Sequence, residues 1–251
     1  MDKRVVEELL QMYRIPLNER ILEIGCGNGD LVWSLKQKNI NITGIDVEFK
    51  DGKYTEDLKR SGDILKISTK GDRLAVKESN KEYKWPVETN SIAMAFSSSV
   101  IEHVANIDEF AQENARVLKE GGIVFHYFPS RTALLEAHTG IPFGGIIQNG
   151  LYYKFACKVV KTYEQFSNDP EKCLKYMKRY THYRSNKTLK KVFRNHGLYF
   201  LRDYSEKTAR VKGYNLASIA IQHNDVARLM FNLTRSNLIA LIKKQGLALS
   251  K

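Results

Sequence analysis

Three glycines at alternate positions are the strongest chemical signal in the sequence. Gly25, Gly27 and Gly29 stand in the run EIGCGNG (23–29), directly after a short apolar segment. Glycine lets the backbone turn sharply and approach a ligand without a Cβ atom in the way. A helix that begins just after such a turn points its first N–H groups at the same place. The spacing therefore predicts a ligand-binding turn; the alternative is a turn with a structural role alone.

The residue that follows this turn discriminates between cofactors. A dinucleotide fingerprint, G-x-G-x-x-G, would place its third small residue at position 30, where this chain has Asp30. An acidic side chain in the first helical turn would repel a pyrophosphate. It is harmless to S-adenosylmethionine (SAM), which carries a sulfonium cation and no phosphate. The pattern favours SAM over NAD.

Asp46 is the second candidate cofactor residue. It closes a β-branched run, Ile40–Val47, and lies 17 residues after Gly29. In a doubly wound sheet, such a carboxylate sits at the carboxyl edge beside the glycine turn and accepts hydrogen bonds from both hydroxyls of a ribose. The alternative is a turn residue at a strand end.

The elements that must position these residues alternate between strand and helix. Alternation of this kind predicts an α/β fold with a mostly parallel sheet and helices on both faces. The predicted helices are 2–13, 30–38, 108–119 (ended by Gly121-Gly122), 188–195 and 214–232, and the predicted strands are 20–24, 40–47, 73–76, 91–97, 123–128, 198–204 and 237–244.

Residues 131–186 break the alternation. They contain two helical stretches, 151–166 and 170–183, rich in tyrosine and lysine. Because they follow a predicted strand, we expect a helical cap inserted over the substrate site, within a single domain that spans residues 1–251.

Three segments resemble the class I SAM-dependent methyltransferases. They are ILEIGCGNGD (21–30), ITGIDVE (42–48) and the stretch from Trp85 to Pro129, in the order of that family. The similarity covers roughly the first 130 residues and is nearest to the type 11 group typified by ubiquinone and menaquinone biosynthesis methyltransferases. The resemblance implies a Rossmann-like fold with a seven-stranded sheet and SAM as the cofactor.

The resemblance also assigns roles by position. It implies that Asp46 binds the ribose, that Val47 flanks the adenine and that His103 is a packing residue. The methionine half of SAM would be lined by Glu23, Gly25, Cys26, Gly27, Asn28 and Gly29, and its reactive end would be faced by Ser97 and Ser98. The adenine amine would be contacted by Glu78 or Asn80, with Asp63 as a further candidate.

A second pair of residues suggests acid–base chemistry. Glu136 and His138 lie in the motif E-x-H-x-G-x-P, just beyond the fifth predicted strand. A histidine with a carboxylate neighbour suits the removal of a proton from an acceptor hydroxyl during methyl transfer. We therefore take Glu136 and His138 as candidate catalytic residues; the alternative is a hydrogen-bond network that orders the loop.

The charge distribution points to an anionic partner. Residues 1–150 hold 19 basic and 22 acidic side chains, whereas residues 151–251 hold 21 basic and 6 acidic ones. Such asymmetry is typical of binding to a phosphate-bearing acceptor, a membrane surface or nucleic acid; the alternative is a solvated basic face.

The sequence thus predicts a methyltransferase that acts, most plausibly by O-methylation, on a small, glycan-linked or lipid-linked acceptor. Peripheral membrane contact is compatible with it. An RNA methyltransferase, with tyrosines stacking on bases, is the alternative, and a SAM-binding protein without catalysis is a third hypothesis.

Cysteine usage and the N-terminal residues suggest the compartment. Three cysteines at non-metal spacings indicate a reducing environment, and they predict neither disulfides nor a metal site. The opening residues have the charge pattern of a helix and not of a signal peptide. We expect a cytoplasmic protein that can lie against a membrane.

Overall fold

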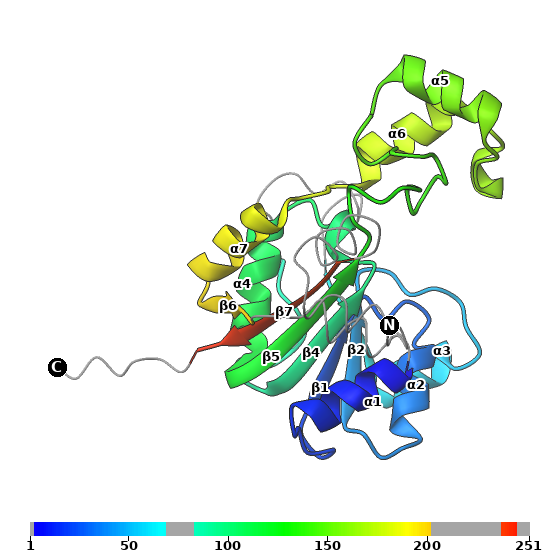
Figure 1. Ribbon diagram of the computed structural model, residues 1–251. Helices are drawn as coiled ribbons and strands as arrows, with labels where there is room; N and C mark the ends of the chain where they lie inside the picture. The colour runs from blue at the N-terminus through cyan, green and yellow to red at the C-terminus, as the bar shows by residue number, and fades with distance from the viewer. Residues whose placement is uncertain (1–2, 69–82, 202–236, 245–251) are drawn as a thin grey trace.

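A computed structural model describes residues 3–68, 83–201 and 237–244, and its centre is a seven-stranded sheet (Figure 1). The strand order is β3-β2-β1-β4-β5-β7-β6, in which β7 alone runs antiparallel to its neighbours. The strands are β1 (Ile21–Ile24), β2 (Ile42–Asp46), β3 (Ile64–Lys66), β4 (Ile92–Ser98), β5 (Leu118–Phe128), β6 (Leu198–Phe200) and β7 (Asn237–Lys243). This is the predicted Rossmann-like class I methyltransferase topology.

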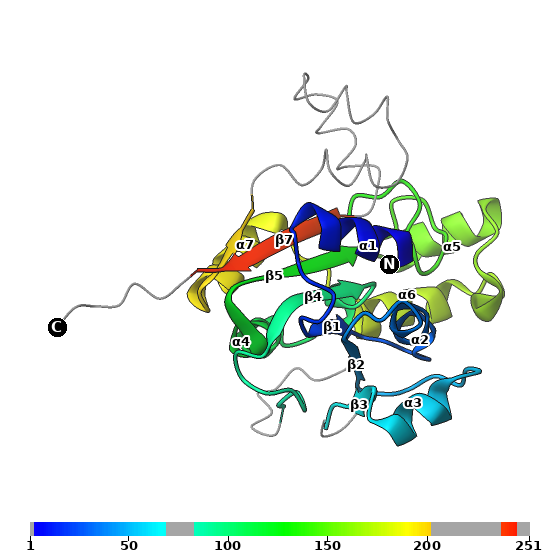
Figure 2. The same ribbon diagram turned by 90° about the horizontal axis from the view of Figure 1, so that it is seen from below.

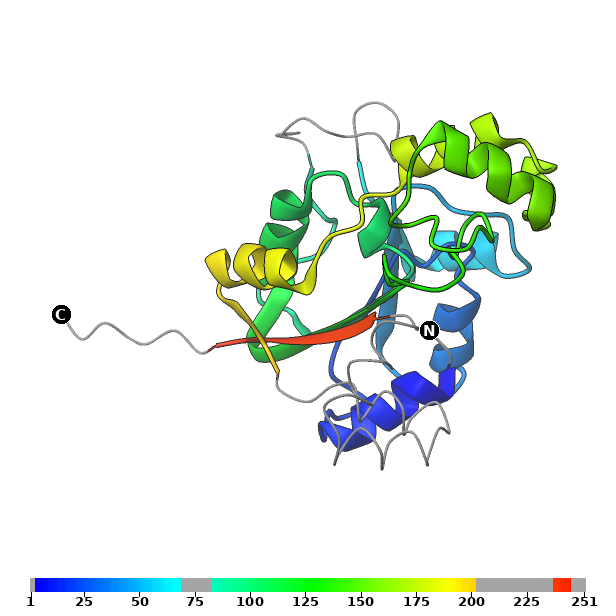
Figure 3. The same cartoon turned by 45° about the horizontal axis from the view of Figure 1, so that its top comes forward.

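Helices cover both faces of the sheet, as predicted (Figure 3). On one face α1 (Lys3–Met12) and α2 (Asp30–Lys36) bury Leu9 and Leu35 against the strands. On the other, α4 (Ile107–Val117) and α7 (Asn186–Asn195) bury Phe110 and Phe193. Each helix contributes one apolar stripe, so the sheet lies between two cores and its strand ends remain available for a site.

The third strand differs from the prediction. The structure has β3 at Ile64–Lys66, where Ile64 pairs in parallel register with Gly44 of β2. It follows α3 (Thr55–Ser61), which Gly62 ends in the left-handed conformation; Figure 2 shows α3 beside β3 at the sheet edge. A three-residue strand leaves too short a pattern to recognise among lysines. The predicted strand 73–76 and the predicted helix 214–232 lie outside the described residues.

The boundary between α4 and β5 also differs. The prediction ended the helix at Gly121-Gly122, but α4 ends at Val117 and β5 begins at Leu118. The two glycines lie inside β5, where its pairing with β4 shifts between Ile92 and Met94. A Cβ atom on Gly122 would lie 2.8 Å from the Lys119 carbonyl oxygen. The glycines therefore serve a bulge in the strand, not a helix end.

The inserted segment 131–186 contains α5 (Gly150–Val159), the short helix η2 (Glu164–Phe166) and α6 (Pro170–Tyr180). The two longer helices pack together in a small core of their own, made by Tyr153, Cys173 and Met177. They lie beyond the carboxyl ends of the parallel strands (Figure 1). Within the described part of the chain, no helix is long and apolar enough to cross a membrane.

Candidate active site

The glycine turn is tied directly to the end of β2. The Gly27 N–H donates a hydrogen bond of 2.8 Å to Asp46 Oδ2, and the Glu48 N–H lies 3.2 Å from Asp46 Oδ1. Gly27 holds a φ of +57°, which glycine adopts without strain. Each carboxylate oxygen keeps lone pairs beyond these contacts. Asp46 is thus held where it can also accept hydrogen bonds from a ligand.

Gly25 is required by a close approach of the chain. Its φ is +76°, and a Cβ atom there would lie only 2.3 Å from Cγ2 of Val100. Val100 follows β4 and leads into the short helix η1 (Ile101–His103). Any larger residue at position 25 would collide with Val100. Gly25 therefore allows the turn after β1 to pack against the segment after β4 at the carboxyl edge of the sheet.

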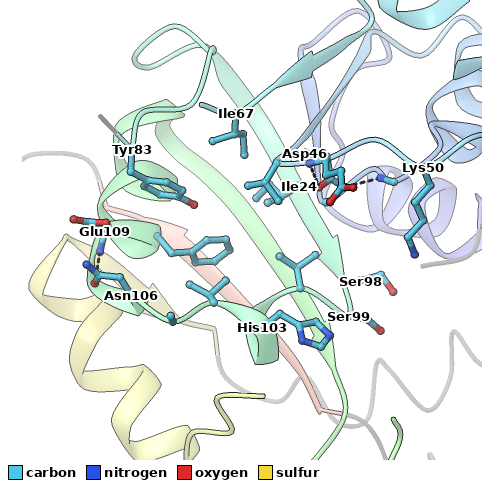
Figure 4. A pocket seen from close by; sticks show the side chains of 18 of the residues that line it. Ile24, Asp46, Lys50, Ile67, Tyr83, Ser98, Ser99, His103, Asn106 and Glu109 are labelled. Atoms are coloured by element: carbon cyan, nitrogen blue, oxygen red, sulfur yellow. Dashed lines mark hydrogen bonds between the residues drawn. The ribbon is translucent and has the colours of Figure 1, made fainter. Parts of the chain in front are cut away.

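A cleft with a volume of about 390 Å³ opens at this edge (Figure 4). Asp46 from β2 and His103 from η1 both border it, and Tyr83 and Phe110 give it an apolar wall. The other lining residues are Ile24, Gly25, Gly27, Val47, Glu48, Lys50, Ile67, Ser98, Ser99, Val100, Val104, Ala105, Asn106, Glu109 and Tyr176. The cleft therefore has a polar end beside the glycine turn and an apolar interior, as ligand sites commonly do.

Five of the predicted cofactor residues line this cleft: Gly25, Gly27, Asp46, Val47 and Ser98. The predicted residue Ser97 does not line it. Its hydroxyl is fully buried and lies 2.8 Å from His126 Nδ1 on the neighbouring strand.

Three more predicted residues support the turn from outside the cleft. The Cys26 side chain is buried against Gly44. A Cβ atom added to Gly44 would lie 2.9 Å from the Cys26 sulfur. Asn28 bonds to Asp30 through its side chain, and the Gly29 N–H donates to the Cys26 carbonyl. The predicted adenine contacts Glu78 and Asn80 lie outside the described residues.

Glu23 lies in β1, just before the lining residues Ile24 and Gly25. Its side chain is buried, and its Oε2 atom has no hydrogen-bond partner among the described residues. Burial raises the pKa of Glu23 to about 8, and the charge of Asp46 acts in the same direction. A buried carboxyl without a partner is the group that a cationic ligand would satisfy.

Two histidines meet where the cap contacts the sheet edge. His103 Nε2 and His138 Nε2 lie 3.2 Å apart. His103 lines the cleft, whereas His138 comes from the cap and lies behind it. The other nitrogen of His103, Nδ1, is 2.6 Å from the carbonyl oxygen of Tyr180 in α6. A residue that the resemblance assigned to packing therefore connects the cleft to the cap.

Glu136 orients His138. Its Oε1 atom accepts hydrogen bonds from His138 Nδ1 and from the Tyr183 hydroxyl, both at 2.7 Å, and its Oε2 atom accepts from the backbone of Thr139. Burial opposes ionisation of this carboxyl, but the bonds from His138, Tyr183 and Thr139 hold the pKa of Glu136 below its usual value. Glu136 both orders its loop and positions the ring of His138.

Glu102 completes this group, and the sequence prediction missed it. Its side chain is 1% exposed, and neither carboxylate oxygen has a hydrogen-bond partner among the residues that the structure describes. Burial of the Glu102 carboxyl raises its pKa to about 7. Burial of the His103 ring lowers the pKa of His103. The signal that could have found it is the pair Glu102-His103, four and five positions after the end of the buried strand β4.

The topology, the glycine turn tied to an acidic strand end and the cleft between them define a Rossmann-like class I methyltransferase domain, the class that uses SAM. Residues 22–126 match the family model described as a methyltransferase domain. Over these residues the chain matches a methyltransferase domain, and its fold is that of the SAM-dependent class I methyltransferases.

Comparison with individual proteins gives the same class. The chain is 29% identical over 157 residues to the mitochondrial ubiquinone biosynthesis O-methyltransferase of Mus musculus, which covers 61% of this chain and 38% of that protein. It is 27% identical over 120 residues to a SAM-dependent Diels-Alderase of Talaromyces variabilis, covering 48% of this chain and 39% of the relative.

Among solved structures, phosphoethanolamine N-methyltransferase 2 of Haemonchus contortus with bound SAM shares the fold. The TM-score is 0.51 at 13% identity, and the match covers 96% of this chain and 52% of that one. The chain spans about two fifths of the length of the curated relatives it matches.

We predict that Asp46→Asn weakens SAM binding by about 1.5–3 kcal/mol, roughly 10- to 150-fold, because charge-assisted hydrogen bonds to the ribose are lost. The amide oxygen can still accept from Gly27, so the turn should persist. Isothermal titration calorimetry measures the effect. Asp30→Asn, in the exposed part of the turn, is the matched control and should bind as the wild type does. Equal affinity in the Asp46 variant would remove this residue from the site.

We also predict that SAM binding releases a proton from Glu23. Below about pH 8 the free carboxyl is mostly protonated, whereas a bound cation favours the ionised form. Affinity should therefore rise with pH between 6 and 8, by at most about tenfold per unit. Calorimetry in buffers of different ionisation enthalpy measures the proton directly. Glu23→Gln should abolish the release, and an unchanged release would contradict the assignment.

Proposed function

We propose that the chain transfers the methyl group of SAM to an oxygen atom of a small, lipid-linked or glycan-linked acceptor. The observation that carries this proposal is that the cleft with the cofactor residues is bordered by His103, whose Nε2 atom lies 3.2 Å from Nε2 of His138 in the inserted segment. A hydroxyl acceptor must lose a proton when it attacks the methyl carbon. The His103 ring provides a polar group at the place where this hydroxyl would arrive, and His138 contacts that ring from the inserted segment.

Glu23, Asp46 and the glycine turn fit SAM. Asp46 offers a fixed carboxylate for the ribose hydroxyls, and Glu23 offers a buried carboxyl for the ammonium group of the methionine part. The apolar wall of Val47 and Tyr83 suits the adenine ring. Since the sulfonium is already a good leaving group, the main work of the protein would be to position the two reactants.

The inserted segment would act as a substrate cap. Tyr176 of α6 borders the cleft, and His138 and Tyr183 fill the space behind His103. The cap is joined to the sheet edge by hydrogen bonds from the His182 N–H to the Glu102 carbonyl oxygen and from Arg184 to the Ala105 carbonyl oxygen. These contacts support an acceptor site between the cap and the cofactor.

One face of α5 supports a membrane-associated acceptor. Leu151, Phe155 and Val159 recur every four residues and therefore share one face of the helix; their exposed fractions are 84%, 66% and 67%. Lys154 and Lys158 are exposed beside them. An apolar stripe flanked by lysines is typical of helices that lie in the interface of an anionic membrane. We propose that this face brings the cap to lipid-linked acceptors.

Two alternatives make different demands. RNA methylation would use the basic cap to contact several phosphates, yet an exposed leucine, phenylalanine and valine give no polar contact to them. Catalysis other than methyl transfer is represented by the Diels-Alderase relative. The pair of histidines at the end of the cleft favours proton removal and hence methyl transfer to a hydroxyl.

The function can be tested with SAM labelled in its methyl group, supplied with total lipid extract, with water-soluble metabolites or with RNA. We expect label in a lipid product, released S-adenosylhomocysteine, and loss of at least about 90% of this transfer in Asp46→Asn, consistent with a tenfold or greater loss of cofactor affinity. Label in RNA that disappears with Asp46→Asn would replace the proposal by the RNA alternative. SAM binding without label in any fraction would favour catalysis without methyl transfer.

The membrane contact can be tested with vesicles. We predict that Leu151→Ser with Phe155→Ser reduces sedimentation with vesicles of anionic phospholipid at least about tenfold, because burial of these side chains contributes about 1.5–3 kcal/mol each. Leu17→Ser, an exposed leucine outside the cap, is the control. Binding that survives the double substitution but vanishes at high salt would indicate a purely electrostatic polyanion site.

A further inference from the structure

Three metal-ligating side chains converge at the junction of the cap and the sheet edge. They are Glu102 and His103, from η1, and His138, from the cap; we call them the junction triad. One ligand atom from each lies within 4.8 Å of the others. His103 borders the cofactor cleft, so the junction triad lies at its wall.

The hydrogen bonds of the two rings leave a conflict between them. His103 Nδ1 faces the Tyr180 carbonyl oxygen, which can only accept, so this nitrogen carries a proton. His138 Nδ1 faces the Glu136 carboxylate and donates for the same reason. In two neutral rings, both Nε2 atoms would then present lone pairs to one another across 3.2 Å. Something positive must lie between them: a shared proton or a metal ion.

The geometry agrees with an ion. Two nitrogen ligands at 2.0–2.1 Å from a tetrahedral zinc ion are separated by about 3.3 Å, close to the observed 3.2 Å. In metal sites, the second nitrogen of each histidine ligand donates to a carboxylate or a backbone carbonyl, which fixes the ring. Glu136 and Tyr180 provide both kinds of partner here.

Glu102 supplies the third ligand and an independent argument. Its side chain is 1% exposed, and within the described part of the chain neither oxygen has a hydrogen-bond partner. A buried carboxylate is costly unless it is paired or binds a metal. Because it lies within 4.8 Å of both imidazole nitrogens, an ion bound by the two rings would draw it inward and satisfy it.

We propose that the junction triad binds a divalent transition-metal ion of the zinc type, with Glu102, His103 and His138 as ligands. Two histidines and a glutamate leave a fourth coordination position, as in catalytic zinc sites. His103 places the ion beside the cofactor cleft, so this position suits an oxygen atom of the acceptor. With both Nε2 atoms bound to the ion, the ion and not a free imidazole nitrogen would ease the loss of the hydroxyl proton. The sequence had suggested no metal site, because its cysteine spacing was the only metal signal considered.

The ion site does not depend on methyl transfer, and it can be measured without SAM. The full chain is freed of metal with a chelator and titrated with Zn²⁺ by calorimetry and with Co²⁺ by visible absorption. We expect one ion per chain and the intense absorption bands of a tetrahedral Co²⁺ site. Glu102→Gln and His138→Asn should each weaken binding at least about 10- to 100-fold.

Two further variants keep the test decisive. His196→Asn changes a histidine bonded to Asp108 outside the junction triad and should bind Co²⁺ as the wild type does. Glu136→Gln leaves all three ligands in place but removes the carboxylate behind His138, and should weaken binding about 10- to 100-fold. Glu136→Gln therefore still tests the metal site if the Glu102→Gln variant does not fold.

The outcomes separate this proposal from the proposed function. Absence of stoichiometric Co²⁺ binding, or equal binding in Glu102→Gln, His138→Asn and Glu136→Gln, would overturn the metal site and leave a shared proton between the rings. Normal SAM binding alongside that result would leave the methyltransferase proposal intact. If the wild-type chain binds Co²⁺ but transfers no methyl group to any acceptor fraction, the result counts against the proposed function and leaves the metal site intact.

Discussion

The hydrogen bond between the Gly27 N–H and the Asp46 carboxylate is the contact on which the cofactor cleft depends. It joins the turn after β1 to the end of β2, and parallel pairing places both at the same edge of the sheet. The register that sets Ile24 beside Ile45 and Ser97 brings the end of β4 there as well. Because a parallel sheet aligns its carboxyl ends, strand pairing brings the three loops together, and the bond from Gly27 to the Asp46 side chain joins two of them.

The second constraint is the attachment of the cap. Residues 131–186 have their own small apolar core and meet the sheet edge mainly through polar contacts. His103 is held there by the backbone carbonyl of Tyr180, the last residue of α6, and Glu102 by the backbone N–H of His182, just after it. The cap therefore completes the site without sharing the main hydrophobic core, an arrangement in which cap and acceptor specificity can vary while the cofactor domain stays constant.

Buried acidic groups mark where the structure gives up stability for function. Glu23 and Glu102 are both buried, both have oxygen atoms without partners, and burial raises the pKa of each. Both stand beside the same cleft, one at the glycine turn and one at the cap. By contrast, the carboxylate of Glu113, which lies in α4 away from this pair, is paired with Arg116 and with the Trp85 N–H. Unsatisfied buried charge concentrates at functional sites because ligands complete it there.

How far the sequence leads depends on how local the interaction is. The glycine turn, Asp46 and the alternation of strands and helices are encoded in short segments, so the α/β class and the place of the glycine turn at the sheet edge could be predicted from the sequence, whereas the role of residues 131–186 as a substrate cap stays a prediction. Even there, a three-residue β3 and the bulge at Gly121-Gly122 were missed, because their form is set by pairing with β2 and β4. The sequence also could not show that the Ser97 side chain points away from the cleft, because its direction is set by a hydrogen bond with His126 on the neighbouring strand.

The junction of Glu102, His103 and His138 could only be decided by the tertiary structure. Glu102 and His138 are 36 positions apart in the sequence, and no periodicity relates η1 to the cap. Glu136 and His138 could be identified as a pair, since they are two positions apart, but their orientation toward His103 depends on how α6 and Tyr183 pack. Short-range patterns specify turns and faces; the meeting of side chains from distant segments is determined by packing, which no single segment encodes.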